Sequence, residues 1–214
     1  MRINAIVENI NGNILLDIGT DHGYVLIKAL KTGRIKRGIA VEIAKKPLER
    51  AKINAQKHQV DHLILFILSN GFKNVKEDYD IVSITGLGYK TIENILLQKH
   101  KEPNYYLLGA HSKVEKLRSF LSNNNFSIED EILVYEKHYY VIIKAVRGIK
   151  KLNDEDILLG PILKEKVTSI PYYEEKLNKI NEITIRRTLK ENSEFYIKRN
   201  LYLKQINYLR NKKG

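Results

Sequence analysis

One stretch of the chain decides the fold: Asn13-Ile14-Leu15-Leu16-Asp17-Ile18-Gly19-Thr20-Asp21-His22-Gly23-Tyr24. It is a short apolar run that breaks into a glycine turn carrying two carboxylates and an imidazole. Such a break is typical of a buried strand whose carboxyl end opens onto a ligand, because Gly19 lets the backbone bend sharply. Asp17, Asp21 and His22 are too polar to continue a buried strand unless a partner satisfies them. The stretch therefore predicts a ligand site at a strand end.

Further apolar runs of strand length follow, and each run but the last precedes a stretch with helical character. The runs are Asn13–Ile18, Gly38–Ile43, Leu63–Leu68, Asp80–Thr85 and Asn104–Gly109. Residues Pro47–His58, for example, place apolar side chains at helical spacing, as expected for a helix on a sheet face. This alternation predicts a parallel α/β sheet.

The pattern then changes to two β-rich runs, Glu131–Glu136 and Tyr139–Val146, joined by Lys137-His138. So short a connection joins only antiparallel neighbours. Five parallel strands that finish in an antiparallel pair form the sheet of a class I, Rossmann-like methyltransferase, whereas a standard dinucleotide-binding fold keeps its strands parallel. We expect this α/β domain to span residues 1–150.

Residues 151–214 predict a second, helical hairpin domain. Gly160-Pro161 and Ile170-Pro171 place proline where helices start, and Glu191–Glu194 is expected to form a turn with a capping residue. Apolar residues at helical spacing are expected to bury against each other, namely Leu177, Ile180 and Ile183 against Ile197, Leu201, Tyr202, Ile206 and Leu209. The hairpin is interpreted either as a substrate-gripping arm or as a dimerisation or stabilising coil.

The amino-acid composition indicates the cellular compartment of the protein and the chemical class of its binding partner. The 214 residues include no cysteine, which excludes disulfides, thiolate zinc sites and a thiol nucleophile, and no metal site is predicted. Neither a signal peptide nor an apolar run long enough to span a bilayer is evident, so we expect a cytoplasmic protein without membrane contact. A net charge of +12, from 37 Lys and Arg against 25 Asp and Glu, favours a polyanion or an acidic surface as partner.

The basic residues concentrate in residues 28–52 and 195–214. Each cluster is interpreted as a solvated helix face or as a surface that follows phosphates, and two clusters in one chain favour the second interpretation. The first contains Lys28, Lys31, Arg34, Lys36, Arg37, Lys45, Lys46, Arg50 and Lys52, and the second contains Lys198, Arg199, Lys204, Arg210, Lys212 and Lys213.

The turn after the first strand indicates the class of cofactor. In the dinucleotide fingerprint a second glycine lets the backbone approach a pyrophosphate, but this chain has Asp21 there, and a carboxylate repels a diphosphate. The Asp21 carboxylate instead suits a cationic ligand such as S-adenosylmethionine, which carries an ammonium and a sulfonium. Glu42 closes the second strand, where an open α/β sheet presents an acid to ribose hydroxyls, although an acid at a strand end is also an ordinary solvated residue.

Two further strand ends are candidates for the same site. Ser69-Asn70-Gly71-Phe72 offers an amide to the edge of an adenine and a ring to its face, although Asn-Gly is also an ordinary turn. Gly86-Leu87-Gly88-Tyr89 leaves space for a flat base that Tyr89 stacks on, or it is a plain structural turn.

Together these residues resemble the bacterial tRNA (adenine-22-N1)-methyltransferase family of the TrmK type. The similarity spans nearly the whole chain, and its most specific element is the D-I-G-[ST]-D-H-x-Y turn. The chain departs from the family pattern at Asn70, at Tyr89 and at Gly109-Ala110-His111. The matching residues are Asp17–Tyr24, Glu42, Asn70-Gly71, Gly86–Gly88 and Gly160-Pro161.

The resemblance implies a methyltransferase domain followed by a helical, coiled-coil-like domain. It implies methyl transfer from S-adenosylmethionine to N1 of adenosine 22 in the D-arm region of tRNA. We expect the protein to be a monomer. The cofactor-binding residues would be Asp17, Gly19, Asp21, Glu42, Asn70, Gly71 and Gly86. Asp21, His22 and Tyr24 would lie nearest the transferred methyl. Gly88 would border the target base. From their chemistry we further expect Tyr89 and His111 to contact the base, and from their charge we expect Lys28, Arg34, Lys36 and Arg37 to bind the RNA.

The mechanism expected from the chemistry is a direct displacement, because neutral adenine already carries a lone pair at N1. Asp21 would stabilise the developing positive charge, and His22 would orient it, contact the base or bond only to backbone. The alternatives are a catalytically impaired RNA-binding protein with this fold, and an enzyme acting on a small molecule or a protein.

Overall fold

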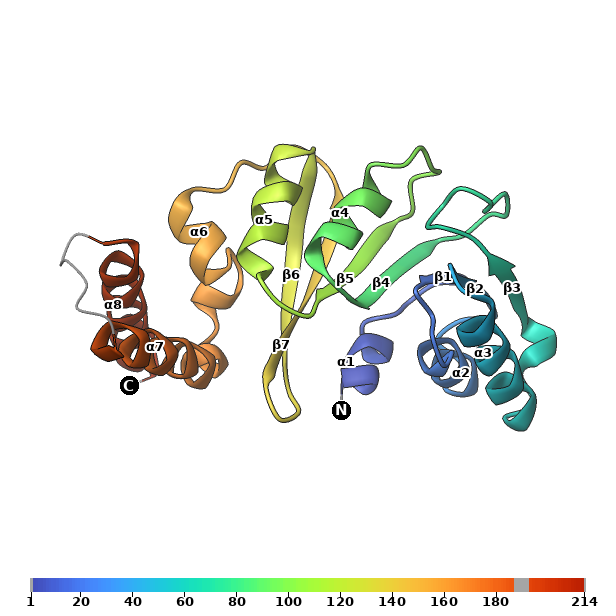
Figure 1. Cartoon of the computed structure of the whole chain (residues 1–214), viewed down its shortest axis with the longest axis horizontal. Coiled ribbons are helices and arrows are strands. Elements are labelled where there is room, and N and C mark those ends of the chain that lie inside the picture. The colour runs from blue at the N-terminus through green and yellow to red at the C-terminus, as the bar shows by residue number, and fades with distance from the viewer. Residues whose placement is uncertain (1, 187–192, 214) are drawn as a thin grey trace. The chain divides into compact units, whose positions relative to one another are not determined.

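A computed structural model describes residues 2–186 and 193–213, and the chain divides into two compact units, Met1–Lys150 and Lys151–Gly214. The first unit contains a seven-stranded sheet with the order β3-β2-β1-β4-β5-β7-β6 (Figure 1). Strands β1 to β5 are parallel, and β7 runs antiparallel to both β5 and β6. This arrangement confirms the predicted sheet. The strands are β1 (Ile14–Ile18), β2 (Arg37–Glu42), β3 (Ile64–Leu68), β4 (Ile81–Leu87), β5 (Tyr105–Ala110), β6 (Phe126–Tyr135) and β7 (Tyr139–Arg147).

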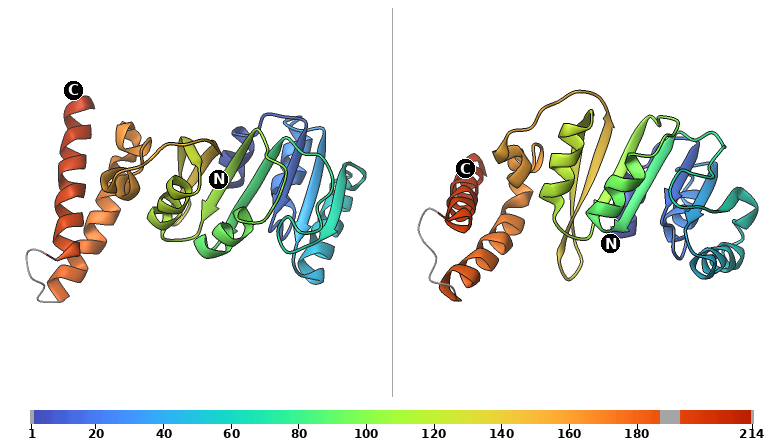
Figure 2. Two further views of the ribbon diagram at one scale, coloured as in Figure 1. Left: turned by 90° about the horizontal axis from the view of Figure 1, so that it is seen from above. Right: turned by 45° about the horizontal axis from the view of Figure 1, so that its top comes forward.

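Helices cover both faces of this sheet (Figures 1 and 2). One face carries α1 (Arg2–Glu8), α2 (Tyr24–Lys31) and α3 (Lys45–Lys57), and the other carries α4 (Tyr89–Leu96) and α5 (Val114–Asn123). Right-handed crossovers from β1 outward in both directions place the helices in this way. Under the first face, buried side chains from helix and strand, such as Leu15, Leu26 and Leu107, form one core.

Four predictions about this unit are wrong in detail. No helix follows β3, because Gly71 takes a φ of 65° and Ser69 Oγ accepts the N–H of Asn74 at 3.0 Å, which holds the chain in turns. A helix, α5, does follow β5, and β6 begins at Phe126 rather than Glu131. Strand β4 continues past Thr85 to Leu87 through a register shift, so it reaches further toward the strand-end loops than predicted.

The second unit is helical. It contains α6 (Asp154–Leu159), two 3-10 turns, η2 (Leu163–Glu165) and η3 (Val167–Ser169), and the long helices α7 (Ile170–Arg186) and α8 (Glu194–Lys213). A capping box between Asn153 and Asp156 starts α6. Pro171 lies in the first turn of α7, as predicted. Gly160-Pro161 ends α6 instead of starting a helix, because Gly160 takes a φ of 95°.

Helices α7 and α8 pack against each other, as the sequence predicts. Of the expected contact residues, Ile180, Tyr202, Ile206 and Leu209 are buried. Ile197 is 56% exposed, so its predicted burial is wrong. In the predicted turn, Glu191 and Asn192 lie outside the described residues. Within the described part of the chain, no helix is both long and apolar enough to cross a membrane.

Candidate functional site

The turn after β1 opens onto a cavity of about 300 Å³. From β1 the sheet continues on one side with β2 and β3, and on the other side with β4 and β5, so the strand order changes direction at β1. Open α/β sheets bind ligands at such a switch point, outside the carboxyl ends of the strands. The cavity also involves Arg2, Thr20 and Thr85, which the sequence analysis did not single out. The predicted site residues that line it are Asp17, Gly19, Asp21, His22, Tyr24, Gly86 and His111.

Asp17 is the buried carboxylate of this cavity, with only 4% of its surface exposed. Burial raises its pKa to about 6, Glu42 adds to the rise, and the nearby hydroxyls of Thr20 and Ser83 oppose it. Both hydroxyls lie near the carboxylate, but neither meets the distance and angle criteria for a hydrogen bond to any described residue. A buried carboxylate beside an unsatisfied Thr20 hydroxyl in the cavity wall favours a polar, cationic ligand.

Glycines allow the backbone to line the cavity closely. Gly19 has a φ of 77° and Gly86 a φ of 79°, a region that side chains disfavour. A Cβ at Gly19 would lie 3.1 Å from Leu87 Cδ1. The N–H of Gly19 donates to the carbonyl of Val41 at 2.9 Å, which ties the turn to β2. The shape of this turn therefore depends on glycine.

Asp21 is held on two sides at the cavity rim. Its backbone has a φ of 45°, and its N–H donates to Glu42 Oε2 at 3.3 Å. Arg50 Nη2 donates to Asp21 Oδ1 at 3.1 Å. His22 Nε2 lies 3.5 Å from Asp21 Oδ2, and its ring stacks on Tyr24 with centroids 5.4 Å apart. The side chains predicted to lie nearest the methyl group are thus in contact with one another.

Arg50, the ion-pair partner of Asp21, was not among the site residues predicted from the sequence. It lies on α3, and the sequence shows it only as one member of a basic cluster. The Arg50 pair leaves the Asp21 carboxylate exposed, with 57% of the side chain accessible. Asp21 can therefore face a ligand while Arg50 fixes its orientation.

Glu42 and Gly71 follow along the same sheet edge, at the ends of β2 and β3. The second carboxylate oxygen of Glu42 accepts the N–H of Ile43 at 2.9 Å. Gly71 has a φ of 65°, and a Cβ there would lie 2.6 Å from Gln98 Oε1, so any other residue would be strained and would displace Gln98. Phe72 was expected to be available to an adenine, but it is 3% exposed and stacks on His100 with centroids 3.9 Å apart. The neighbouring Asn70 is exposed.

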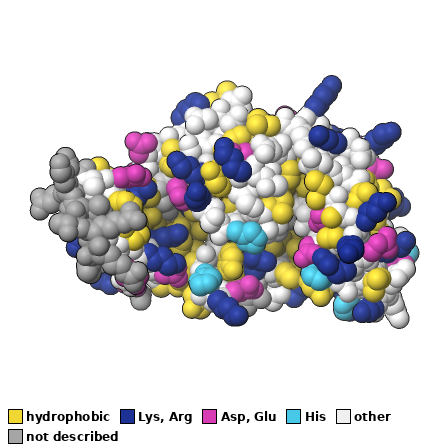
Figure 3. Space-filling view, viewed as in Figure 1, with side chains coloured by type: hydrophobic (Ala, Val, Ile, Leu, Met, Phe, Trp, Pro, Cys, Tyr) yellow, Lys and Arg dark blue, Asp and Glu magenta, His cyan; other side chains and the backbone are white. Residues whose placement is uncertain are grey.

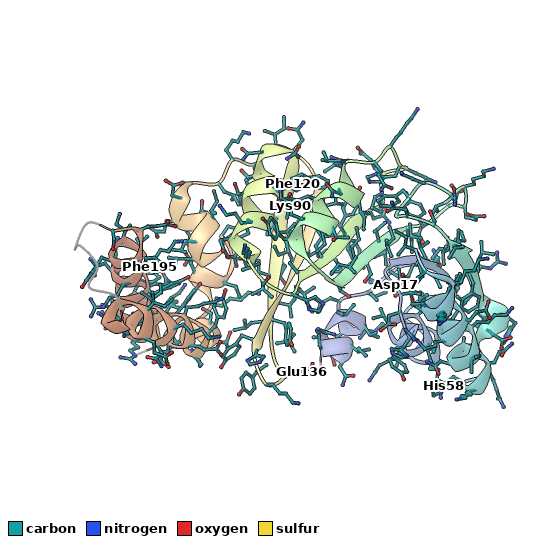
Figure 4. The ribbon with its side chains drawn as sticks, viewed as in Figure 1. Asp17, His58, Lys90, Phe120, Glu136 and Phe195 are labelled. Carbon is teal, nitrogen blue, oxygen red and sulfur yellow. The ribbon has the colours of Figure 1, made fainter. Side chains whose placement is uncertain are left out.

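Helix α1 contributes Arg2, Ile3 and Ile6 to the cavity wall, and the β6–β7 hairpin contacts this helix. The backbone N–H of Arg2 donates to Glu136 Oε1, and the Arg2 guanidinium lies 5.0 Å from the centre of the Tyr140 ring. Figure 4 shows Glu136 at the hairpin tip beside α1, with Asp17 further along the sheet. Hydrogen bonding to Arg2 lowers the pKa of Glu136. The hairpin therefore braces the helix that carries Arg2.

Three of the predicted substrate-binding residues do not lie at this edge. Arg37 begins β2 and Glu42 ends it, so at about 3.3 Å per residue the two are about 17 Å apart along the strand. Arg34 and Lys36 precede Arg37 in the loop before β2, at the edge opposite the cavity. Lys28, on α2, donates to Asn4 Oδ1. The structure therefore separates Arg34, Lys36 and Arg37 from the cavity.

Basic side chains elsewhere are interspersed with acids. Over the first unit, Figure 3 shows Lys and Arg groups with Asp and Glu beside them. In the second unit, cations of α8 contact carboxylates of the same unit, namely Lys198 with Glu194, Arg210 with Glu174, and Lys212 with Glu165. The acid-free sequence of residues 195–214 does not reveal these partners, because they precede it in the chain.

Comparison with known proteins identifies the family of this chain. A model of the tRNA (adenine(22)-N(1))-methyltransferase family, TrmK, matches residues 15–209. MG248 of Mycoplasma genitalium is 33% identical over 178 residues, which are 79% of this chain and 80% of that protein. The tRNA (adenine(22)-N(1))-methyltransferase of Bacillus subtilis is 27% identical over 77% of this chain and 75% of its own length.

Solved structures agree with this assignment. M. capricolum TrmK in complex with S-adenosyl-homocysteine is 30% identical, with a TM-score of 0.77 over 99% of this chain and 96% of that chain. Streptococcus pneumoniae Sp1610, in complex with S-adenosyl-L-methionine, is 25% identical, with a TM-score of 0.85 over 96% of this chain and 98% of that chain. The chain belongs to the TrmK family of tRNA (adenine(22)-N(1))-methyltransferases.

Proposed function

We propose that this protein transfers a methyl group from S-adenosyl-L-methionine to N1 of adenosine 22 in tRNA, as its family membership indicates. The observation that carries the proposal in the structure is the cavity at the end of β1, where the buried Asp17 carboxylate meets the unsatisfied Thr20 hydroxyl. The comparisons give no support to a catalytically impaired RNA-binding protein. The Streptococcus pneumoniae and M. capricolum relatives bind the methyl donor and its product, respectively.

The residues present fit this methyl donor. Asp17 offers a carboxylate to an ammonium, and at Gly86 no atom lies within 4 Å of where a Cβ would stand, so a ligand can approach the backbone there closely. Glu42, Asn70 and Gly71 lie at the neighbouring strand ends, where they would hold the ribose and the adenine. The donor supplies a methyl group bound to a sulfonium. The protein's task is to place that group against the substrate nitrogen.

The reaction itself needs little proton transfer, because adenine N1 carries its lone pair before the reaction begins. Asp21 presents an exposed carboxylate at the cavity rim, where positive charge develops on the base, and Arg50 and the Glu42 contact hold it in place. His22 and Tyr24 form a stacked pair beside it that can contact the base. Since N1 lies on the Watson–Crick edge, the adenosine must leave its contacts in folded RNA to enter the cavity.

The decisive experiment compares two tRNA transcripts that differ only at position 22. We expect methyl incorporation into the transcript with adenosine 22 and none into the transcript with guanosine 22. Equal methyl incorporation into both transcripts would refute adenosine 22 as the methylated nucleotide. Calorimetry should show that Asp17→Ala and Glu42→Ala abolish S-adenosyl-L-methionine binding, whereas Glu49→Ala, an exposed acid on α3, should bind like the wild type. Wild-type affinity in both pocket variants would refute the assigned pocket.

We also propose that the enzyme acts as a monomer in the cytoplasm, where tRNA is its partner. Light scattering on the purified protein tests the monomer, with a mass near 24.9 kDa expected. Fractionation of the native cells tests the compartment.

A further inference from the structure

Tyr89 lies at the centre of a small group of cationic side chains. It is the first residue of α4 and half-buried. The Lys90 ammonium lies 5.7 Å from the centre of its ring, and the Lys113 ammonium lies 5.8 Å from it. Lys113 comes from a different loop, between β5 and α5. The start of α4 and the loop between β5 and α5 thus bring positive charge to one aromatic ring.

The two lysines differ in their existing contacts. Lys90 Nζ lies 3.2 Å from Glu93 Oε2, so a carboxylate already balances its charge. Lys113 is exposed and has no carboxylate within ion-pairing distance among the residues described. Its backbone φ of 56° is uncommon for a residue with a side chain. Lys113 is therefore the cation of this group that is free to meet an external anion.

The group adjoins the catalytic cavity without lining it. Neither Tyr89 nor Lys113 belongs to the cavity wall, but His111, two residues before Lys113, does. The backbone N–H of His111 donates to the carbonyl of Leu87 at 3.0 Å, two residues before Tyr89. This hydrogen bond joins the end of β4 to the segment after β5, so Tyr89 and Lys113 both follow closely on residues that line the cavity, Gly86 and His111.

We propose that Tyr89 and Lys113 form a platform for an RNA nucleotide next to the methylated adenosine, with the ring stacking on its base and the ammonium contacting its phosphate. The inference rests on the proposed function, and it gives Tyr89 a role outside the reacting centre. A base and a phosphate in one ligand match an aromatic face flanked by an unpaired cation. Extrusion of the adenosine unstacks its neighbours, and a platform beside the cavity replaces the lost stacking.

The test uses Tyr89→Ala, Tyr89→Phe and Lys113→Asn in the full-length protein, since asparagine tolerates the positive φ of position 113. Lys116→Gln, an exposed lysine on α5, is the matched control for loss of one charge. The measurements are tRNA affinity at several salt concentrations, KM and kcat for tRNA, and the Kd for S-adenosyl-L-methionine.

Tyr89→Ala should weaken tRNA binding by about 10-fold, the usual effect of losing one stacked base, and Tyr89→Phe should bind like the wild type. Lys113→Asn should weaken tRNA binding and lower the slope of log K against log salt by about 0.7 to 0.9, and Lys116→Gln should leave the slope unchanged. The Kd for S-adenosyl-L-methionine should stay constant in all four variants.

Wild-type tRNA affinity and salt slope in both Tyr89→Ala and Lys113→Asn would overturn the platform while leaving the proposed function intact. Equal losses of tRNA and S-adenosyl-L-methionine affinity would overturn it too, because they would show a structural role. A wild-type protein that neither binds nor methylates tRNA would instead overturn the proposed function, and the platform with it.

Discussion

Replacing Asp17 with asparagine should make the protein more stable while it abolishes cofactor binding. Asp17 is buried, and its pKa rises from 3.8 to about 6 because burial disfavours the charged form. Between these two pH values the folded protein holds a proton that the unfolded chain has released. The stability of the wild type therefore falls as the pH rises from about 4 to about 6.

The size of the effect follows from the pKa shift. At about 1.4 kcal/mol per pKa unit, the shift corresponds to about 3 kcal/mol of lost stability at pH 7.5. At pH 5 the folded protein is still mostly protonated at Asp17, and about 1.5 kcal/mol of the loss is present. Asparagine carries no charge at either pH. Asp17→Asn should thus exceed the wild type by about 3 kcal/mol at pH 7.5 and by about half as much at pH 5.

Urea denaturation of both proteins at pH 5 and pH 7.5, without ligand, measures these differences. Asp61→Asn, at a half-buried aspartate far along the chain from the cavity, is the control and should stay within about 0.5 kcal/mol of the wild type. A variant at position 17 that is less stable than the wild type, or a gain that does not depend on pH, would refute the claim that Asp17 is a destabilising buried charge kept for ligand binding.

Three further changes test other parts of the structure. Glu131→Gln should cost about 3 to 5 kcal/mol in thermal or urea unfolding, because it breaks a fully buried pair in which Arg118 Nε lies 2.7 Å from Glu131 Oε1; a loss below 1 kcal/mol would contradict this. Gly71→Ala should raise the Kd for S-adenosyl-L-methionine in calorimetry, because a Cβ would meet Gln98 at a φ of 65°, and unchanged affinity would argue against the strand-end subsite. Asp21→Asn should lower kcat far more than cofactor affinity, and equal losses in both would reduce Asp21 to a pocket residue.

Features set by neighbouring residues were predictable from the sequence. The turn at Gly19 and the acid at Glu42 are both local breaks in apolar runs, and strand polarity places them at one edge. Strand polarity also places Arg37 at the other edge, because it precedes the apolar run that Glu42 closes. The charge of the basic cluster alone does not separate these two edges. Helix α5 has buried residues at helical spacing, such as Val114, Leu117 and Leu121, and was overlooked.

Features set by distant residues were not predictable. Arg50 meets Asp21 only because α3 returns across the sheet, and helical spacing gives no sign of it. Phe72 is buried because His100 supplies a stacking partner 28 positions later. Its position in an Asn-Gly-Phe turn fits an exposed ring equally well. The partners of the α8 cations likewise come from segments far earlier in the chain.

The position of Arg2 has a practical consequence for handling the protein. Arg2 lines the cavity at the end of β1, and its backbone N–H is anchored to Glu136 of the β6–β7 hairpin. Extra residues fused directly ahead of Arg2 would start at the wall of this cavity. If the proposed function holds, a polyhistidine or charged tag at that place would alter the affinities measured for the methyl donor and for RNA, so binding assays require a protein from which such a tag has been removed.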